Sequence, residues 1–163
     1  LILRPLQRSD AGLLEMYGSD ERVARMTRSI PHPLPPGATE SFVARATADE
    51  RDEDVWVLDG SPKGHAELLG LIALERMDRE QSEIGYWVAP AFWNTGLAQE
   101  AVRGIIERNP MDNKTIFASV FQDNPASARV LTNTGFQYLG DAEAFSVARG
   151  ATVPTWTYLK LYR

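Results

Sequence analysis

Helical and strand-like patterns alternate along the whole chain, and this alternation constrains the fold more than any other feature. Residues 55–58 and 115–121 are rich in β-branched, aromatic and other apolar residues, as is typical of buried strands. Between them, residues 97–106 place apolar side chains at helical spacing, which predicts a helix lying against a sheet. No internal repeat or low-complexity tract interrupts the pattern. The chain is therefore expected to form a mixed α/β domain rather than a helical bundle or a β-sandwich.

The pattern predicts seven strands and four or five helices, with residues 1–163 forming one domain. The two strands beginning at residues 68 and 82 follow each other directly, so a meander is the simplest arrangement there. The expected strands are 1–6, 55–58, 68–76, 82–88, 115–121, 136–140 and 155–162. The expected helices are one capped by Ser9 or Asp10, then 21–26, one capped by Thr39 and reaching about residue 52, 96–108, and one that begins after Asn124 and closes at Gly135.

Composition narrows the classes of partner and of chemistry. The chain has 17 basic and 22 acidic residues and a formal net charge of -5, so we expect neither a nucleic acid nor an anionic membrane as its partner. It contains no cysteine, which excludes disulfides, thiolate zinc sites and a cysteine nucleophile, and favours an intracellular, cytoplasmic location. Residues 71–74 form the longest uninterrupted apolar run, far below the ~20 residues of a membrane span, and no signal-peptide pattern opens the chain.

Metal and hydrolase chemistry find no support in the sequence. His32 and His65 are the 2 histidines, and neither has the spacing of metal ligands, so no metal is expected. No G-x-S-x-G motif is present, and His65 has no evident serine partner for a hydrolase triad.

A strand, a small-residue turn and a helix follow one another at residues 83–108. The first N–H groups of a helix lack internal partners, and the helix dipole favours negative charge there, so this arrangement can bind a phosphate. Gly96 lets a ligand approach the main chain, and Asn94 tolerates a left-handed conformation. The small side chain of Ala98 does not project far from the helix surface. Taken alone, a glycine at a helix start is most often an ordinary turn, so the pattern gains weight only from its surroundings.

Those surroundings resemble a known family. The segments LILRPL, EIGYWVAPAFWNTGLAQEAV and NPASARVLTNTGF, together with the aromatic final strand, are similar to the GNAT superfamily of N-acetyltransferases, and within it to the branch of ribosomal-protein-alanine acetyltransferases (RimJ/RimL-type). The resemblance covers nearly the whole chain. It implies a mixed sheet in which two central parallel strands separate from each other, and it implies the use of acetyl-CoA as acyl donor.

The resemblance also assigns residues to the donor. In the family, a six-residue motif binds the pyrophosphate of coenzyme A through backbone amides, and the strand before it holds the pantetheine arm and the thioester carbonyl. Trp93 replaces the family's usual Arg or Gln, and Asn94 stands where Gly is common. The residues implied in donor binding are Trp87, Val88, Ala89, Trp93, Asn94, Thr95, Gly96, Leu97, Ala98, Asn124, Ser127 and Arg129.

Several of these residues also have an ordinary structural interpretation. Asn124 before Pro125 is an excellent helix N-cap on structural grounds alone. Arg129 also fits a solvated helix charge, and Trp87 and Trp93 also fit ordinary packing.

The implied reaction is direct attack of a primary amine on the thioester in a ternary complex. It needs a polarised carbonyl, for which the N–H near Val88 is implied, a base and a source of a proton for the leaving thiolate. Glu83 is the candidate base, since it shares a strand face with Trp87, and Glu75 is the reserve, although either also fits a plain surface carboxylate. Ser127 is the candidate acid, because Leu131 stands where many relatives have a tyrosine; Tyr138 and water are the alternatives.

We expect the acceptor to be a small amine or a protein N-terminus. Its site should be walled by the segment from the first helices through the proline-rich loop at 31–37, a candidate lid, and by the connection 145–154, both predicted to be irregular. The net negative charge favours a cationic amine. Two other classes stay open: an acyl-CoA-binding sensor without turnover, and a structural domain with no ligand. The chain is expected to be a monomer or a homodimer, the latter through an exposed aromatic final strand.

Overall fold

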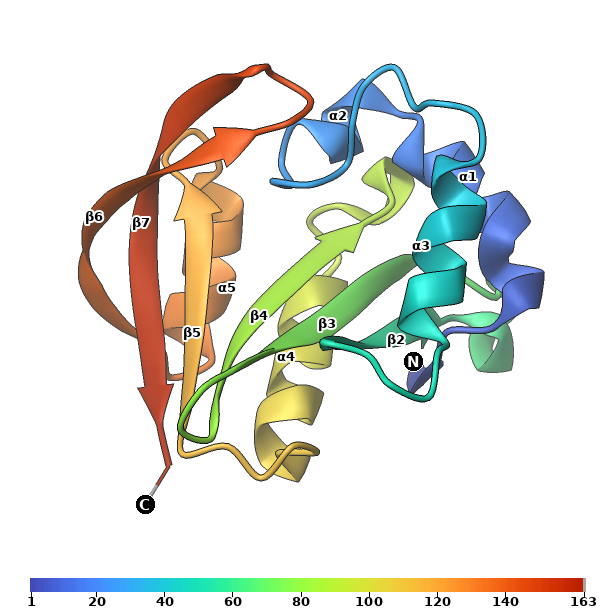
Figure 1. The fold of residues 1–163 in the computed structure, drawn as a ribbon. Coiled ribbons are helices and arrows are strands. Elements are labelled where there is room, and N and C mark those ends of the chain that lie inside the picture. Colours follow the sequence, from blue (N-terminus) through green and yellow to red (C-terminus); the bar gives the residue numbers. More distant parts are fainter. Residues whose placement is uncertain (163) are drawn as a thin grey trace.

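The computed structural model describes residues 1–162, which form one seven-stranded sheet with strand order β1-β2-β3-β4-β5-β7-β6 (Figure 1). The strands are β1 (Ile2–Pro5), β2 (Glu53–Asp59), β3 (Gly70–Met77), β4 (Gln81–Val88), β5 (Thr115–Phe121), β6 (Gln137–Ser146) and β7 (Ala151–Leu161). The α-helices are α1 (Ala11–Gly18), α2 (Glu21–Ala24), α3 (Ala38–Ala46), α4 (Leu97–Arg108) and α5 (Pro125–Asn133), and the short 3-10 helices are η1 (Arg8–Asp10), η2 (Ser61–Lys63) and η3 (Pro90–Phe92). The predicted α/β class, with seven strands and four or five helices, is confirmed.

The sheet is mixed. Strands β1 to β4 pair in sequence as an antiparallel meander, as predicted, whereas β4 and β5 pair in parallel and β7 lies antiparallel between β5 and β6. Helices α1 and α3 lie on one face of the sheet, and α4 and α5 lie on the other (Figure 1). Each face has its own apolar core. Val55, Val57 and Leu71 belong to the first, and Ile72, Ile105 and Leu131 to the second.

The parallel strands β4 and β5 separate along their length. They pair from Gln81 with Thr115 to Ile84 with Ala118, and no pairing continues toward Val88 and Phe121. The gap widens toward the upper end of both strands in Figure 1. This is the separation that the family resemblance implied, and it leaves backbone groups of β4 without a partner strand.

Two helix N-caps differ from prediction. Asp10 does precede α1, but its carboxylate does not cap that helix. It binds the guanidinium of Arg4 at 2.8 and 2.9 Å and accepts a hydrogen bond from the backbone N–H of Gln7 at 2.8 Å. Gly37 rather than Thr39 stands at the N-cap of α3, in the left-handed conformation at φ 80°. The Asp10 carboxylate, which local propensity assigns to a cap, is thus bound by Arg4 and Gln7 instead.

Helix α3 also ends six residues earlier than expected, at Ala46 rather than near residue 52. The backbone N–H of Arg76 donates to the carbonyl of Asp52 at 2.7 Å, and its side chain donates to the carbonyl of Arg51 at 3.0 Å. These bonds hold residues 51 and 52 beside the end of β3, in the approach to β2, and not in a helical turn.

The connection 145–154, which was predicted to be irregular, is part of a long hairpin. Strand β6 reaches Ser146 and β7 begins at Ala151, so the two strands pair almost to the tip. The final strand is not at an edge of the sheet: β7 lies between β5 and β6, and its Tyr158 is 8% exposed, whereas both ends of the strand are exposed. A dimer through this strand stays a prediction. Within residues 1–162, no helix is both long and apolar enough to cross a membrane.

Candidate functional site

A cavity of about 800 Å³ lies where β4 and β5 separate. Strands β2, β3, β4 and β5 contribute to one wall, and α1, α3 and the segment that follows α2 contribute to the other. The proline-rich loop reaches the cavity through Pro31 and Leu34, and the hairpin reaches it through Ala144 and Phe145. The segments that were predicted to wall the acceptor site therefore do surround this space.

The candidate base Glu83 lies on the cavity wall with an ion-pair partner. Its carboxylate binds the guanidinium of Arg28, a residue that follows α2. Glu75 is its register partner on β3, and Glu53 is in turn the partner of Glu75 on β2, so three carboxylates form a row across the strands. Burial raises the pKa of Glu83 and that of Glu53; for Glu83, Arg28 opposes this rise and Glu75 adds to it. A half-buried carboxylate with a raised pKa is a candidate for proton exchange with a ligand in the cavity.

Ser127 meets a tyrosine that the sequence did not single out. The Ser127 hydroxyl donates to the hydroxyl of Tyr86 at 2.9 Å, and the Tyr86 hydroxyl donates to the Ser127 carbonyl at 3.0 Å. Asn124 caps α5 through its Oδ1, which accepts from the Ser127 N–H at 3.3 Å, and all three residues line the cavity. Burial raises the pKa of Tyr86. Residue type alone gave no signal for Tyr86, because an aromatic residue in a strand usually serves packing.

The end of β4 directs its backbone toward two different neighbours. Ala89 donates its N–H to the carbonyl of Leu69 beside β3 at 2.8 Å, so by strand alternation Trp87 also faces β3 and Val88 faces the gap beside β5. The Val88 carbonyl accepts a hydrogen bond from the indole of Trp93 at 2.7 Å. The Trp87 side chain lines the cavity and contacts the ring of Tyr17 edge-on. Of the three predicted positions, Val88 is thus the one whose backbone faces the gap.

The turn before α4 has the conformation that a backbone anion site requires. Asn94 and Gly96 both adopt the left-handed region, at φ 62° and 83°, and α4 begins at Leu97. A side chain added at Gly96 would meet no atom within 4 Å, so the space before the turn is open. Thr95 is exposed and Ala98 is half-buried. The turn lies outside the cavity lining, on the other side of the β4 end.

Arg129 and Thr155 differ in their relation to the cavity. Arg129 is exposed on α5 and does not line the cavity. Thr155 on β7, which sequence reasoning missed, lines the cavity and is 1% exposed. Within residues 1–162 its hydroxyl oxygen has no hydrogen-bond partner, so a polar ligand atom is a fitting partner for it.

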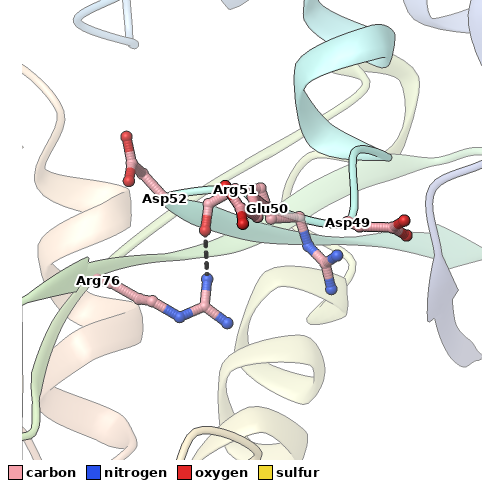
Figure 2. Close-up of a pocket in the computed structure, with 5 residues that line it drawn as sticks. All are labelled: Asp49, Glu50, Arg51, Asp52 and Arg76. Carbon is pink, nitrogen blue, oxygen red and sulfur yellow. Dashed lines mark hydrogen bonds between the residues drawn. The ribbon is translucent and has the colours of Figure 1, made fainter.

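A second depression lies at the turn between α3 and β2 (Figure 2). Figure 2 shows Arg76 of β3 reaching back to the Arg51 carbonyl, with Asp49, Glu50 and Asp52 spread around it. These charged side chains are exposed. Arg76 and Arg51 also share the carboxylate of Asp54. The depression is therefore an ionic cluster at the surface, remote from the gap between β4 and β5.

In the part of the chain that the structure describes, no group of three or more potential ligand residues is arranged to hold a metal. His32 lies exposed in the proline-rich loop, and His65 lies exposed against the ring of Phe92.

Comparison with known proteins supplies the remaining evidence. Residues 1–137 match a protein-family model described as an acetyltransferase (GNAT) domain. A curated relative from Bacillus subtilis (strain 168), the uncharacterized N-acetyltransferase YoaA, is 31% identical over 96 residues, which cover 56% of this chain and 54% of the relative. The chain thus spans about half the length of that relative.

Two solved structures have the same fold over nearly their whole length. Spermidine N-acetyltransferase from Vibrio cholerae, in complex with CoA and spermine, has a TM-score of 0.80 at 17% identity, covering 98% of this chain and 94% of that one. The ribosomal-protein-S5-alanine acetyltransferase from Vibrio fischeri has a TM-score of 0.77 at 20% identity, covering 98% and 91%. At such low identity, these likenesses concern the fold.

Proposed function

The chain belongs to the acetyltransferase (GNAT) domain family, a family of acyltransferases, and we propose that it transfers the acetyl group of acetyl-CoA to a primary amine. The acceptor is a small amine or a protein N-terminal amine. The resemblance to the ribosomal-protein-alanine acetyltransferase branch supports a protein N-terminus, and the fold it shares with a spermidine acetyltransferase supports a small amine.

One observation carries this proposal: the parallel strands β4 and β5 stop pairing after Ile84 and Ala118, and a cavity opens at that point. The unpaired edge offers backbone groups to an extended ligand, as a neighbouring strand would do. The turn that follows β4 then presents the unpartnered N–H groups at the start of α4. An extended ligand that ends in a phosphate group fits this arrangement, because its arm can lie along the unpaired edge of β4 and its phosphate at the start of α4.

The residues of this path suit acetyl-CoA. We propose that backbone amides from Trp93 to Ala98 hold the pyrophosphate and that the Val88 backbone holds the pantetheine arm and polarises the thioester carbonyl. Because the Trp93 indole bonds to Val88, the side chain at this position stabilises the strand end instead of reaching for the ligand. The other proposed contacts are Trp87, Ala89, Asn124, Ser127 and Arg129.

We propose Glu83 as the general base. It accepts a proton from the ammonium form of the acceptor; the free amine nitrogen then forms a bond to the acetyl carbon while the thioester C–S bond breaks. The acceptor must compete with Arg28 for the same carboxylate, so its cationic head enters the position that the guanidinium holds in the free protein. Glu75 and Glu53 extend the negative wall behind Glu83, which favours a cationic acceptor.

The leaving thiolate takes its proton from Ser127 or from water. In the free protein the Ser127 hydroxyl donates to Tyr86. When Ser127 gives this proton to the thiolate, the second proton released by the acylated nitrogen restores the Ser127 hydroxyl, so Tyr86 keeps its own proton. Because the pKa of Tyr86 is raised by burial, this tyrosine acts as a neutral hydrogen-bonding partner and not as an anion.

Release of free thiol from acetyl-CoA tests the proposal. A panel of small polyamines and of peptides with free N-termini is offered with wild-type protein and with Glu83→Gln. We expect thiol release that depends on the amine, acetyl mass added to the acceptor, and loss of both in the variant. Acetyl-CoA binding without release for any amine would instead support an acyl-CoA sensor, and no binding would overturn the proposal.

A further inference from the structure

One side chain near the tip of the β6–β7 hairpin ties three separate segments together. Arg149 donates to both carboxylate oxygens of Asp123, at 2.6 and 3.0 Å, in the turn between β5 and α5. It also donates twice to the carbonyl of Arg25, at 3.0 and 2.7 Å, beyond the end of α2. Its guanidinium lies 4.9 Å from the ring centroid of Phe121, which lines the cavity. The Arg149 side chain is only 17% exposed, whereas its partner Asp123 is 46% exposed. Charge-assisted bonds of this kind, two of them to one carboxylate, fix the direction of the guanidinium.

The hairpin touches the same segment a second time, next to the candidate base. The backbone N–H of Val147 donates to the carbonyl of Arg28 at 3.0 Å. Figure 1 shows the tip of the hairpin reaching over the end of β5 toward the segment that follows α2. The backbone of Arg28 is thus held by the hairpin, while its side chain binds the carboxylate of Glu83.

We propose that Arg149 is a positioning residue for acetyl transfer: by fixing residues 25–28 to the hairpin, it sets the guanidinium of Arg28 against the carboxylate of Glu83. The inference rests on the proposed function, in which Glu83 is the base. Arg149 does not line the cavity itself, and its link to Glu83 runs through the backbone of residues 25–28.

The charges around Glu83 show what this positioning does. Arg28 is the cation bound to its carboxylate, Glu75 and Glu53 approach from β3 and β2, and Arg45 reaches the same cavity from α3. Arg28 offsets both burial and the repulsion from Glu75, each of which favours the protonated form. If residues 25–28 loosen, the Glu83 carboxylate loses this cation, its pKa rises, and the base is protonated over a wider pH range.

The test compares Arg149→Met with Arg28→Met in the full chain. We expect the acid limb of kcat/KM for the amine to move up by about 1 pH unit in Arg28→Met and by about 0.5 unit in Arg149→Met. The KM for acetyl-CoA should stay unchanged, because its proposed pyrophosphate site lies beside α4. Arg149→Lys, which keeps the charge and one donor, should recover part of the shift.

Arg4→Met is the matched control. Arg4 on β1 also joins carboxylates, those of Asp10 and Asp59, to a backbone carbonyl, that of Glu67, and its side chain is 19% exposed, but it does not line the cavity. We expect no shift of the acid limb in this variant. An equal shift in Arg4→Met would mean that general loosening of the fold moves the profile, and it would overturn the proposal.

A readout without turnover separates this inference from the proposed function. Carbon-13 NMR titration of the Glu83 carboxyl should show an upward displacement of its pKa in Arg149→Met, and none in Arg4→Met. An unmoved pKa would overturn the positioning role even if Glu83→Gln is inactive. If the pKa moves but Glu83→Gln is fully active, the effect of Arg149 on the Glu83 carboxylate stands, and the assignment of Glu83 as the base is overturned. Should Arg149→Met not fold, Asp123→Asn removes its ionic partner and must move the pKa in the same direction.

Discussion

The hydroxyls of Tyr86 and Ser127 lie 2.9 Å apart and hydrogen-bond to each other at the point where β4 and β5 have separated. Tyr86 is carried by β4 and Ser127 by the first turn of α5, so the pair joins β4 to the helix that follows β5. Each hydroxyl thus has its position fixed by the other. The pair brings an exchangeable proton to the cavity wall without any charged group.

Ser127→Ala should lower kcat about tenfold and leave the affinity for acetyl-CoA within twofold, because it removes one proton source while water remains another. Steady-state thiol release and a calorimetric titration measure the two quantities. A variant that loses affinity but keeps kcat would assign Ser127 to binding alone.

Tyr86→Phe should destabilise the fold by about 1 kcal/mol, because it removes the hydrogen bond to the Ser127 carbonyl and leaves the Ser127 hydroxyl without its acceptor. Urea unfolding followed by tryptophan fluorescence gives the free energy of unfolding. Tyr138→Phe is the control, since this tyrosine is exposed on β6, and it should cost less than half as much. Equal losses would show that the buried pair adds no stability of its own.

Glu83→Gln should also change the pH dependence of stability. Burial raises the pKa of the Glu83 carboxyl, so the folded chain holds this proton more tightly than the unfolded chain. The stabilising contribution of this group is then complete below its unfolded pKa of about 4.3 and is lost as the pH rises through the raised value. The neutral glutamine avoids that loss, so the variant should gain stability relative to wild type between pH 4 and pH 7. Urea unfolding at both pH values checks the sign, and a relative loss over this interval would contradict it.

Asp10→Ala should lower the free energy of unfolding by about 3 kcal/mol, because it leaves Arg4 without its bidentate partner and the Gln7 N–H without its acceptor. Glu80→Ala, which breaks the exposed pair with Lys114, should cost less than about 0.5 kcal/mol. Thermal and urea unfolding of both variants test the contrast. Similar losses would mean that burial of Asp10 adds nothing to its ion pair.

The sequence predicted those elements whose signals are local. The helix α4, the cap at Asn124 and the left-handed Gly135 follow from residue types a few positions apart, and the structure has all three. The turn that we propose as the pyrophosphate site was also predicted, because a strand, small residues and a helix occur there in immediate succession.

What the sequence missed depends on contacts between distant residues. The bonds from Arg149 to the Arg25 carbonyl join residues 124 positions apart, and no pattern along the chain reports them. Residues 51 and 52, which were expected to lie in a helix, are instead held beside β3 by hydrogen bonds from Arg76. Much of β6 and the start of β7 are exposed, so they lack the apolar alternation that identifies a strand, and pairing between them supplies the regularity.

The central claim is that the turn before α4 receives the pyrophosphate of acetyl-CoA. Gly96→Val tests it by adding bulk to the open space before that turn. Gly64→Val is the matched control. Gly64 has a similar φ of 78°, also faces open space and follows η2, which does not line the cavity. Both variants therefore carry the same backbone strain of about 1–2 kcal/mol.

The decisive measurement is a calorimetric titration of wild type, Gly96→Val and Gly64→Val with acetyl-CoA, each variant first shown to be folded by circular dichroism. The proposed site predicts saturable binding to wild type and to Gly64→Val, and at least a hundredfold weaker binding to Gly96→Val. Equal affinity in all three proteins would contradict the placement of the donor, and absence of binding to folded wild type would contradict the acetyl-CoA-dependent function itself.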